Sequence, residues 1–229
     1  MSAQREPLPP SSSHIITDND AASYLAALDI SVEDLRDSLL DAFDAANNRD
    51  SKYWPNTSQG YEFWAQLVHG VRSRLDKSEH WEVDNPDNRP VMLREGKRYE
   101  LAFARGDAAT GNPDAEPNFA RKAGPATISA ANRFLDPDQF ALISLANLIT
   151  AEESSGPSSH PAGTWIVLYR YREGTINCEV SIPARIDNNG FVDSWWVRVL
   201  LPPITDFPNV DHPELPDSLN DDDLNFSII

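Results

Sequence analysis

Apolar residues are most concentrated between residues 164 and 203. Three runs rich in Trp, Tyr, Val and Ile lie in this stretch: Trp165–Tyr171, Thr175–Ile182 and Ser194–Leu201. Glu173-Gly174 separates the first two runs, and a short loop containing Gly190 separates the last two. Short glycine-containing loops between β-prone runs indicate hairpins. The pattern therefore predicts an antiparallel β-meander over about residues 164–203.

A second hairpin is predicted over about residues 91–104. Val91–Arg94 and Lys97–Ala104 flank Glu95-Gly96, and the second run alternates apolar with polar or small side chains. Such alternation is typical of a strand with one buried face. The meander itself is apolar on both faces, so it needs cover on both sides.

Helices predicted from the spacing of apolar residues supply that cover. Ser31 is a suitable N-cap for a helix whose apolar residues recur every three or four positions from Val32 to Ala46. Further helices are predicted from a start near Asp18–Asp20, from Thr57 or Ser58 to about Leu75, from Pro125 to Phe134, and from Pro137 to Ile149. The fold class is therefore α+β, a meander and a hairpin covered by N-terminal and central helices.

The chain of 229 residues is long enough for one substantial core. We predict a disordered leader over residues 1–16, one domain over 17–204 and an acidic tail over 205–229. The domain has a helical part, 17–77, and a mixed part, 78–204. The sequence has no apolar run of about 20 residues and no signal-peptide pattern at its start. With a single cysteine, Cys178, we expect a cytoplasmic protein.

Charge is sorted along the chain, whose net charge is −17. Residues 1–48 carry 2 basic and 9 acidic side chains, and residues 205–229 carry 0 and 7, so each end has a charge of −7. Residues 89–133 are the basic exception, with 8 basic and 5 acidic side chains. A chain this acidic is unsuited to binding duplex nucleic acid with its general surface.

The basic segment contains a candidate anion site. Arg121, Lys122 and Thr127 surround the expected start of the helix at Pro125, where backbone N–H groups are free to bind an anion. Four more cations, Arg94, Lys97, Arg98 and Arg105, extend the site if the hairpin lies alongside. The aromatic residues Tyr99 and Phe119 are interleaved, as in single-strand binders. The alternative is that these cations pair with the acidic ends of the chain.

Two acidic surfaces are candidates for partner binding. One is the polar face of the second predicted helix, with Asp37, Asp41 and Asp44. The other is the tail, with Asp221, Asp222, Asp223, Leu224 and Phe226. This ending resembles the acidic tips of bacterial single-stranded-DNA-binding proteins, which recruit replication and repair enzymes, although those tips end on the phenylalanine and Ser227–Ile229 follow it here. Docking on a partner, docking on its own sheet and disorder are equally consistent with the pattern.

Signatures of catalysis are weak. The five histidines are scattered, and neither a phosphate-binding glycine loop nor a dinucleotide fingerprint occurs. Cys178 shares strand parity with apolar neighbours and is expected in the core. Glu100, Asp107 and Glu179 are candidate acid–base groups, but surface positions explain most strand carboxylates. We predict no catalytic residue, metal or cofactor.

The function predicted from these observations is a non-enzymatic accessory or regulatory protein that binds a basic protein partner, such as a nucleic-acid-processing enzyme or complex. The alternative is a nucleic-acid-handling factor, single-strand binding or hydrolytic, that uses the basic segment 89–133. A third class is a small-molecule enzyme with a pocket between the long loop after residue 105 and the sheet.

Overall fold

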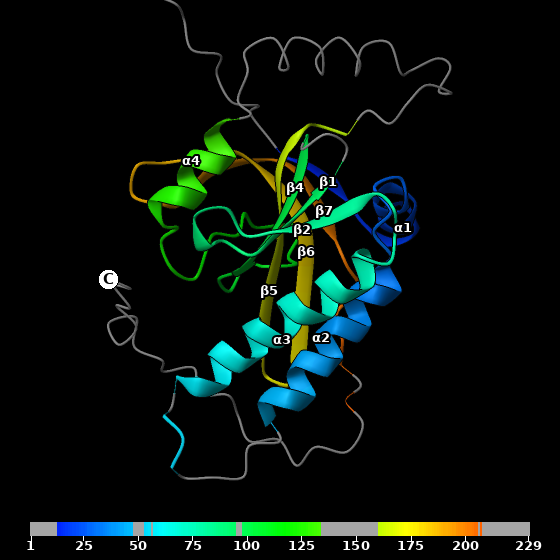
Figure 1. The fold of residues 1–229 in the computed structure, drawn as a ribbon, viewed down its shortest axis with the longest axis vertical. Coiled ribbons are helices and arrows are strands. Elements are labelled where there is room, and N and C mark those ends of the chain that lie inside the picture. Colours follow the sequence, from blue (N-terminus) through cyan, green and yellow to red (C-terminus); the bar gives the residue numbers. More distant parts are fainter. Residues whose placement is uncertain are drawn as a thin grey trace, which may run out of the picture.

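In a computed structural model of the chain, seven strands form one mixed sheet in the order β1-β7-β6-β5-β4-β3-β2 (Figure 1). The structure describes residues 13–47, 53–55, 57–94, 98–133, 160–205 and 207. The strands are β1 (His14–Ile16), β2 (Trp81–Asp84), β3 (Val91–Arg94), β4 (Tyr99–Arg105), β5 (Gly163–Arg172), β6 (Thr175–Ile186) and β7 (Val192–Leu200). The helices in the described residues are α1 (Asp18–Ala26), α2 (Val32–Asn47), α3 (Ser58–Leu75) and α4 (Pro125–Arg133), with a 3-10 turn, η1 (Pro86–Asn88).

The prediction of an antiparallel meander over residues 164–203 with a separate hairpin over 91–104 is wrong. β4 pairs in parallel with β5, and β1 pairs in parallel with β7, so all the strands belong to one mixed sheet. β4 and β5 run in parallel, and the described part of the chain between them, residues 106–133, covers one face of the sheet instead of turning back in a hairpin. His14–Ile16, which we assigned to the disordered leader, forms β1. A strand this short has too little alternation to be recognised from sequence.

The three long strands β5, β6 and β7 pair antiparallel with one another. The turn between β5 and β6 consists of Glu173 (φ 49°) and Gly174 (φ 72°), which join the paired residues Arg172 and Thr175. A two-residue hairpin with both positions in the left-handed region matches the twist of the strands it connects. Such a turn fixes the register of β5 against β6.

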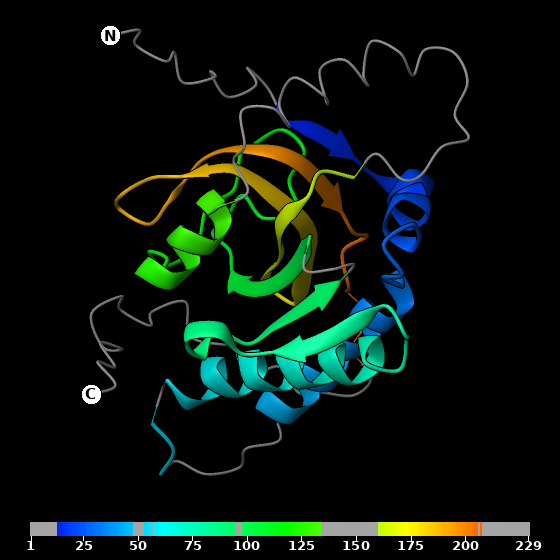
Figure 2. The same cartoon turned by 45° about the horizontal axis from the view of Figure 1, so that its top comes forward.

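Helices α1, α2 and α3 cover one face of the sheet (Figure 2). The Oγ of Ser31 accepts a hydrogen bond from the backbone N–H of Asp34 (3.1 Å), which confirms Ser31 as the cap of α2. The apolar stripes of α2 and α3 then pack on the sheet, with Phe63 stacked on Tyr169 at a centroid distance of 5.0 Å. No helix in the described part of the chain is long and apolar enough to cross a membrane.

The opposite face is covered by α4 and by the segment between β4 and α4, residues 106–124. The buried residues of this smaller core include Phe119, Ala131, Ile166, Leu168 and Trp195. The sheet is therefore covered on both sides, as its two apolar faces require. The helix predicted from Pro137 to Ile149 lies outside the described residues.

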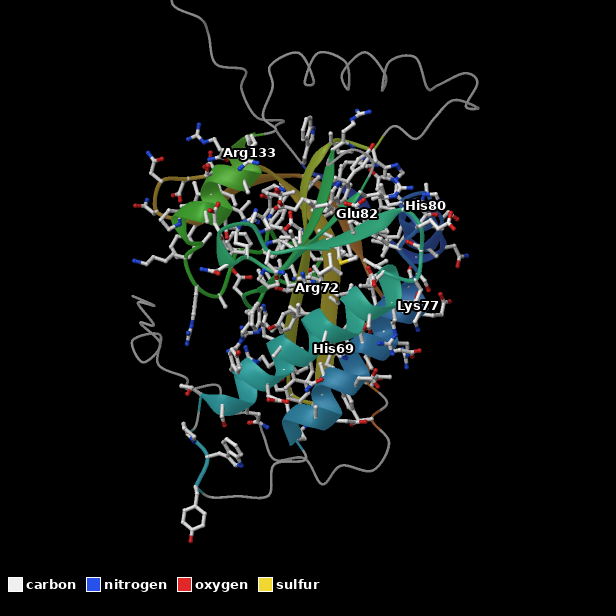
Figure 3. The ribbon with its side chains drawn as sticks, in the orientation of Figure 1. His69, Arg72, Lys77, His80, Glu82 and Arg133 are labelled. Carbon is white, nitrogen blue, oxygen red and sulfur yellow. The ribbon has the colours of Figure 1, made fainter. Side chains whose placement is uncertain are left out.

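The outermost strand, β2, is tied to the helices by two side chains. Arg72 of α3, labelled in Figure 3, donates one hydrogen bond to the carbonyl oxygen of Asp84 (2.7 Å) and another to Oδ1 of Asn85 (3.1 Å). Nε1 of Trp81 donates to the carbonyl oxygen of Leu28 (2.9 Å), and the indole is buried. Arg72 thus holds the end of β2 against α3, and Trp81 holds its start against the turn after α1. Among the described strands, β3 pairs with β4 only as far as Leu101.

Candidate functional site

A cleft of about 440 Å³ opens at the outer edge of β4, between the first turns of α3 and the start of α4. Its lining comes from six parts of the chain: Thr57, Gly60, Tyr61 and Trp64 at the start of α3; Asn88, Arg89 and Pro90 before β3; Ala102–Arg105 of β4; Phe119, Arg121, Lys122 and Ala123 before α4; Thr127 of α4; and Ile166 and Tyr169 of β5. Clefts of this size suit a small ligand or one unit of a polymer.

The cleft exists because β3 is shorter than β4. The paired register ends at Met92 and Leu101, and two residues further along it would bring Pro90 opposite Phe103. Proline has no N–H to donate to a ladder, so pairing cannot continue past it. Beyond this point the edge of β4 faces the cleft instead of a strand.

The charge of the lining is opposite to that of the chain. Arg89, Arg105, Arg121 and Lys122 line the cleft, and the lining within the described residues includes no Asp or Glu. The whole chain has 36 acidic and 19 basic residues. Four basic side chains, of which Arg89 is paired with Glu100, and no acidic side chain in the described lining make the cleft a strong local departure from the average surface.

Arg89 is held in place by a buried carboxylate on β4. Its Nη1 and Nη2 donate to the two carboxylate oxygens of Glu100 at 2.8 and 3.0 Å, a bidentate arrangement. Oε1 of Glu100 also accepts from Oγ1 of Thr164 (3.1 Å). We predicted a surface position for Glu100, but it is buried and acts as the partner that orients Arg89.

Aromatic rings form much of the cleft wall. Tyr61 and Trp64 lie one helical turn apart with ring centroids 5.8 Å from each other, and Tyr61 is 65% exposed. Phe119 lies across the cleft and packs edge-on against Trp195. Burial raises the pKa of Tyr169, so its hydroxyl stays protonated at all physiological pH values. The wall thus combines an exposed ring at the rim with fixed rings inside.

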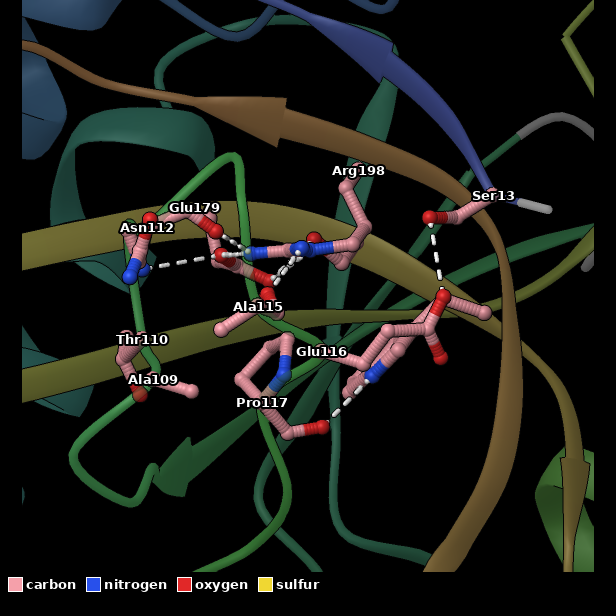
Figure 4. A network of polar contacts seen from close by, with 12 residues as sticks. Ser13, Ala109, Thr110, Asn112, Ala115, Glu116, Pro117, Glu179 and Arg198 are labelled. Atoms are coloured by element: carbon pink, nitrogen blue, oxygen red, sulfur yellow. Dashed lines mark hydrogen bonds and ion pairs between the residues drawn. The ribbon is translucent and has the colours of Figure 1, made fainter.

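The loop that carries Phe119, Arg121 and Lys122 is anchored by a buried ion pair beneath it. Glu179 of β6 and Arg198 of β7 are fully buried, and Nη2 of Arg198 donates to Oε2 of Glu179 at 2.7 Å (Figure 4). Arg198 also donates to the carbonyl oxygens of Ala115 (2.7 Å) and Asn112 (3.0 Å). Glu179 accepts from the backbone N–H of Gly111 (3.0 Å). The two side chains therefore bond to each other and to the backbone of the loop.

Further backbone contacts close the loop. The N–H of Asp107 donates to the carbonyl oxygen of Asn118, and the N–H of Ala120 donates to the carbonyl oxygen of Arg105, each at 2.9 Å. The two ends of the loop therefore lie side by side. The N–H of Ala123 donates to the carbonyl oxygen of Gly190 (2.8 Å). Gly190 has φ 88°, and a Cβ there would lie 2.6 Å from the carbonyl oxygen of Ala123. Only glycine fits where the β6–β7 turn supports the basic residues.

The predicted anion-site residues separate into two groups. Arg105, Arg121, Lys122 and Thr127 line the cleft, as does the aromatic Phe119. The remaining cations do not: Arg94 is buried and paired with Asp29, Arg98 is exposed with its guanidinium 6.0 Å from the ring of Tyr99, and Lys97 lies outside the described residues. The basic segment is thus split by the sheet, because strand β4 places its two ends in different surroundings.

The acidic helix face is where we predicted it. Asp37 and Asp41 on α2 are exposed and Asp44 is partly buried. Arg74 of α3 donates to Asp41 at 2.8 Å, so part of this charge is balanced within the molecule. The tail residues Asp221, Asp222, Asp223, Leu224 and Phe226 lie outside the described residues. Binding of a basic partner by either acidic surface stays a prediction.

Sequence analysis missed Arg89, Tyr61 and Trp64 as site residues. Trp64 has the spacing of the apolar stripe that predicts α3, and helical periodicity alone does not distinguish a core face from a cleft wall. A usable signal for Arg89 was the Pro90 that follows it, since a proline at the start of a short strand indicates where pairing stops.

The reactive and ionisable side chains named in the sequence outside the cleft have structural surroundings. Cys178 is buried, as predicted, and burial raises the pKa of its thiol, which keeps it protonated and unreactive. Asp107 caps its own turn by accepting from the N–H of Ala109 (3.0 Å), and Glu179 is occupied by Arg198. No group of three or more His, Cys, Asp or Glu side chains suited to a metal ion occurs in the described ranges.

Comparison with known proteins adds no assignment, since no protein-family model, no curated protein and no solved structure matches this chain.

Proposed function

We propose that the protein binds single-stranded nucleic acid in the cleft at the outer edge of β4. The observation that carries the proposal is the composition of the lining, which among the described residues contains Arg89, Arg105, Arg121 and Lys122 but no acidic side chain, in a chain of net charge −17. Cations gathered in an aromatic-walled cleft attract phosphates while the rest of the surface repels them.

The aromatic wall favours unpaired bases as the ligand. Base–aromatic stacking contributes about 1–3 kcal/mol per base and requires a base with an accessible face, which duplex nucleic acid does not offer. Tyr61 is exposed at the rim, with Trp64 next to it, and Phe119 lies inside. A base that enters between these rings has its phosphate beside the basic side chains.

Two further exposed aromatic residues lie before α3 in the sequence. Tyr53 is 84% exposed and Trp54 is 53% exposed, and both precede Thr57 at the cleft by only a few residues. Exposed aromatic residues a few positions before the cleft residue Thr57 suit the successive bases of a strand better than a single nucleotide. The expected ligand is therefore a polymer that occupies the cleft with one unit and the rim with the next.

Fluorescence anisotropy with a labelled single-stranded oligonucleotide of about 12 nucleotides, at rising salt, tests this proposal. Replacing Arg121 and Lys122 together with alanine should weaken binding at least tenfold and reduce the slope of log K against log salt by about 1.4, because each lost phosphate contact removes about 0.7. The matched control replaces two exposed cations away from the cleft, Arg36 and Lys77, with alanine. It should leave the isotherm unchanged.

Thermal melts of both double variants establish that they are folded. Equal losses of affinity in the cleft variant and in the control would indicate a general charge effect and contradict the proposal. So would an absence of binding at low salt, or a preference for duplex over single strand.

A further inference from the structure

At the outer edge of β4, the backbone of Phe103 has no partner among the described residues. Gly163 donates its N–H to the carbonyl oxygen of Arg98, and Gly106 donates its N–H to Tyr169, which shows that even-numbered residues of β4 bond to β5. Since strand residues alternate in the side to which their backbone groups point, the N–H and C=O of Phe103 point away from β5. They face the cleft, which Phe103 lines.

Nothing in the described part of the chain bonds to these two groups. The paired register of β3 and β4 ends at Leu101, and Pro90, the residue next in position opposite Phe103, has no N–H. Phe103 makes no backbone hydrogen bond to Pro90 or to any other described residue on this side. One donor and one acceptor on the same residue therefore lie side by side at the wall of the cleft.

This pair matches the edge of a nucleobase. Every base carries an adjacent donor and acceptor on its pairing edge, so one strand residue satisfies both. An extended peptide needs a longer free edge, because strand addition uses successive residues of the same parity. The next such residue, Arg105, already accepts at its carbonyl oxygen from the N–H of Ala120 (2.9 Å). The free edge is thus limited to the length of one base.

We propose that the N–H and C=O of Phe103 hydrogen-bond the pairing edge of a base held between the aromatic rings of the cleft. This inference rests on the proposed function and names the element that reads the ligand. Stacking and phosphate contacts alone bind any strand with little regard to its bases. The Phe103 edge makes binding depend on a base whose pairing edge is free.

Ligands that differ only at this edge provide the first test. Oligothymidylate is compared with the same strand containing N3-methylthymine. The methyl group keeps the ring and the phosphates, replaces the N3–H donor and hinders access to the carbonyl oxygens beside it. One net hydrogen bond contributes about 1 kcal/mol, so two give a loss of about fivefold to thirtyfold in affinity on methylation. An abasic strand of equal length measures the electrostatic contribution alone.

Two variants of the same residue provide the second test. Phe103→Pro removes the side chain and the backbone N–H, whereas Phe103→Ala removes the side chain and keeps the N–H. Proline is tolerated on a strand edge whose N–H is not part of a ladder, so both variants should fold, which thermal melts and circular dichroism check. Phe103→Pro should bind oligothymidylate about fivefold more weakly than Phe103→Ala. The two should bind the N3-methylated strand equally.

Each outcome separates the two proposals. Equal affinity for methylated and unmethylated strands, with both bound in the cleft, would overturn base reading by Phe103 and leave single-strand binding intact. No binding of any strand would overturn both. Binding of an extended acidic peptide that is sensitive to Phe103→Pro, with no strand bound, would instead identify the edge as a peptide site and overturn both proposals.

Discussion

Replacing Arg198 with methionine should destabilise the protein strongly, because it removes one member of the buried ion pair beneath the cleft loop. Glu179 would remain fully buried with only the N–H of Gly111 and the hydroxyl of Ser181 as donors. Removing one partner of a buried pair costs about 3–5 kcal/mol, since the remaining charge is uncompensated. The carbonyl groups that Arg198 bonds in the loop each add at most about 1 kcal/mol, because the loop can open to water. We expect a loss of about 4–5 kcal/mol.

Guanidinium denaturation followed by tryptophan fluorescence measures this loss, since Trp195 lies under the same loop and donates to the carbonyl oxygen of Pro117 (2.7 Å). The double variant Glu179→Gln with Arg198→Met removes the unpaired charge. It should recover at least about 2 kcal/mol relative to Arg198→Met alone, because a neutral pair avoids the burial of a charge. A single variant that loses less than about 1 kcal/mol, or a double variant no more stable than the single one, would refute the reasoning.

Three further predictions concern the turn and the core. Gly190→Ala should cost about 1–3 kcal/mol in the free energy of unfolding and weaken single-strand binding, because its Cβ displaces Ala123; Gly124→Ala, where a Cβ meets nothing within 4 Å, is the control in denaturation and anisotropy experiments. Cys178 should not react with a thiol reagent at pH 8 unless the protein is unfolded in about 6 M guanidinium; a fast native reaction would contradict its burial. The hydrogen bond that Asp187 accepts from the N–H of Phe191 lowers the pKa of its carboxyl, and the bonds from Asn189 lower it further. Its folded-state pKa lies below the unfolded value of about 3.9, so its stabilising contribution is present above pH 4 and is lost as the pH falls through the folded pKa; the melting temperatures of wild type and Asp187→Ala should converge there.

Local patterns predicted the elements that have strong periodicity. Ser31 caps α2, and α3 runs from Ser58 to Leu75 as its apolar stripe indicates. The sheet was not predictable in the same way, because parallel pairing depends on which strands meet after a crossover. Tyr99 of β4 pairs with Gly163, far along the chain, and no local signal encodes that contact.

The candidate site was predictable only in part. Arg121, Lys122 and Thr127 were found because they surround a helix start that the sequence marks with Pro125. Arg89 and Tyr61 come from segments distant in sequence, and the fold brings them to one cleft beside Pro90, which precedes β3. The ion pair of Glu179 and Arg198 was not predicted, because strand alternation does not show which side chains of β6 and β7 meet.

The most direct test of single-strand binding in this cleft is photo-crosslinking of the full chain to an oligonucleotide containing 5-iodouracil, with the attachment sites mapped by mass spectrometry. We predict that the crosslinked peptides contain Tyr61, Trp64 or Phe119, and that an excess of unlabelled strand prevents the reaction. Crosslinks confined to peptides outside the cleft, or unaffected by the competitor, would contradict the account.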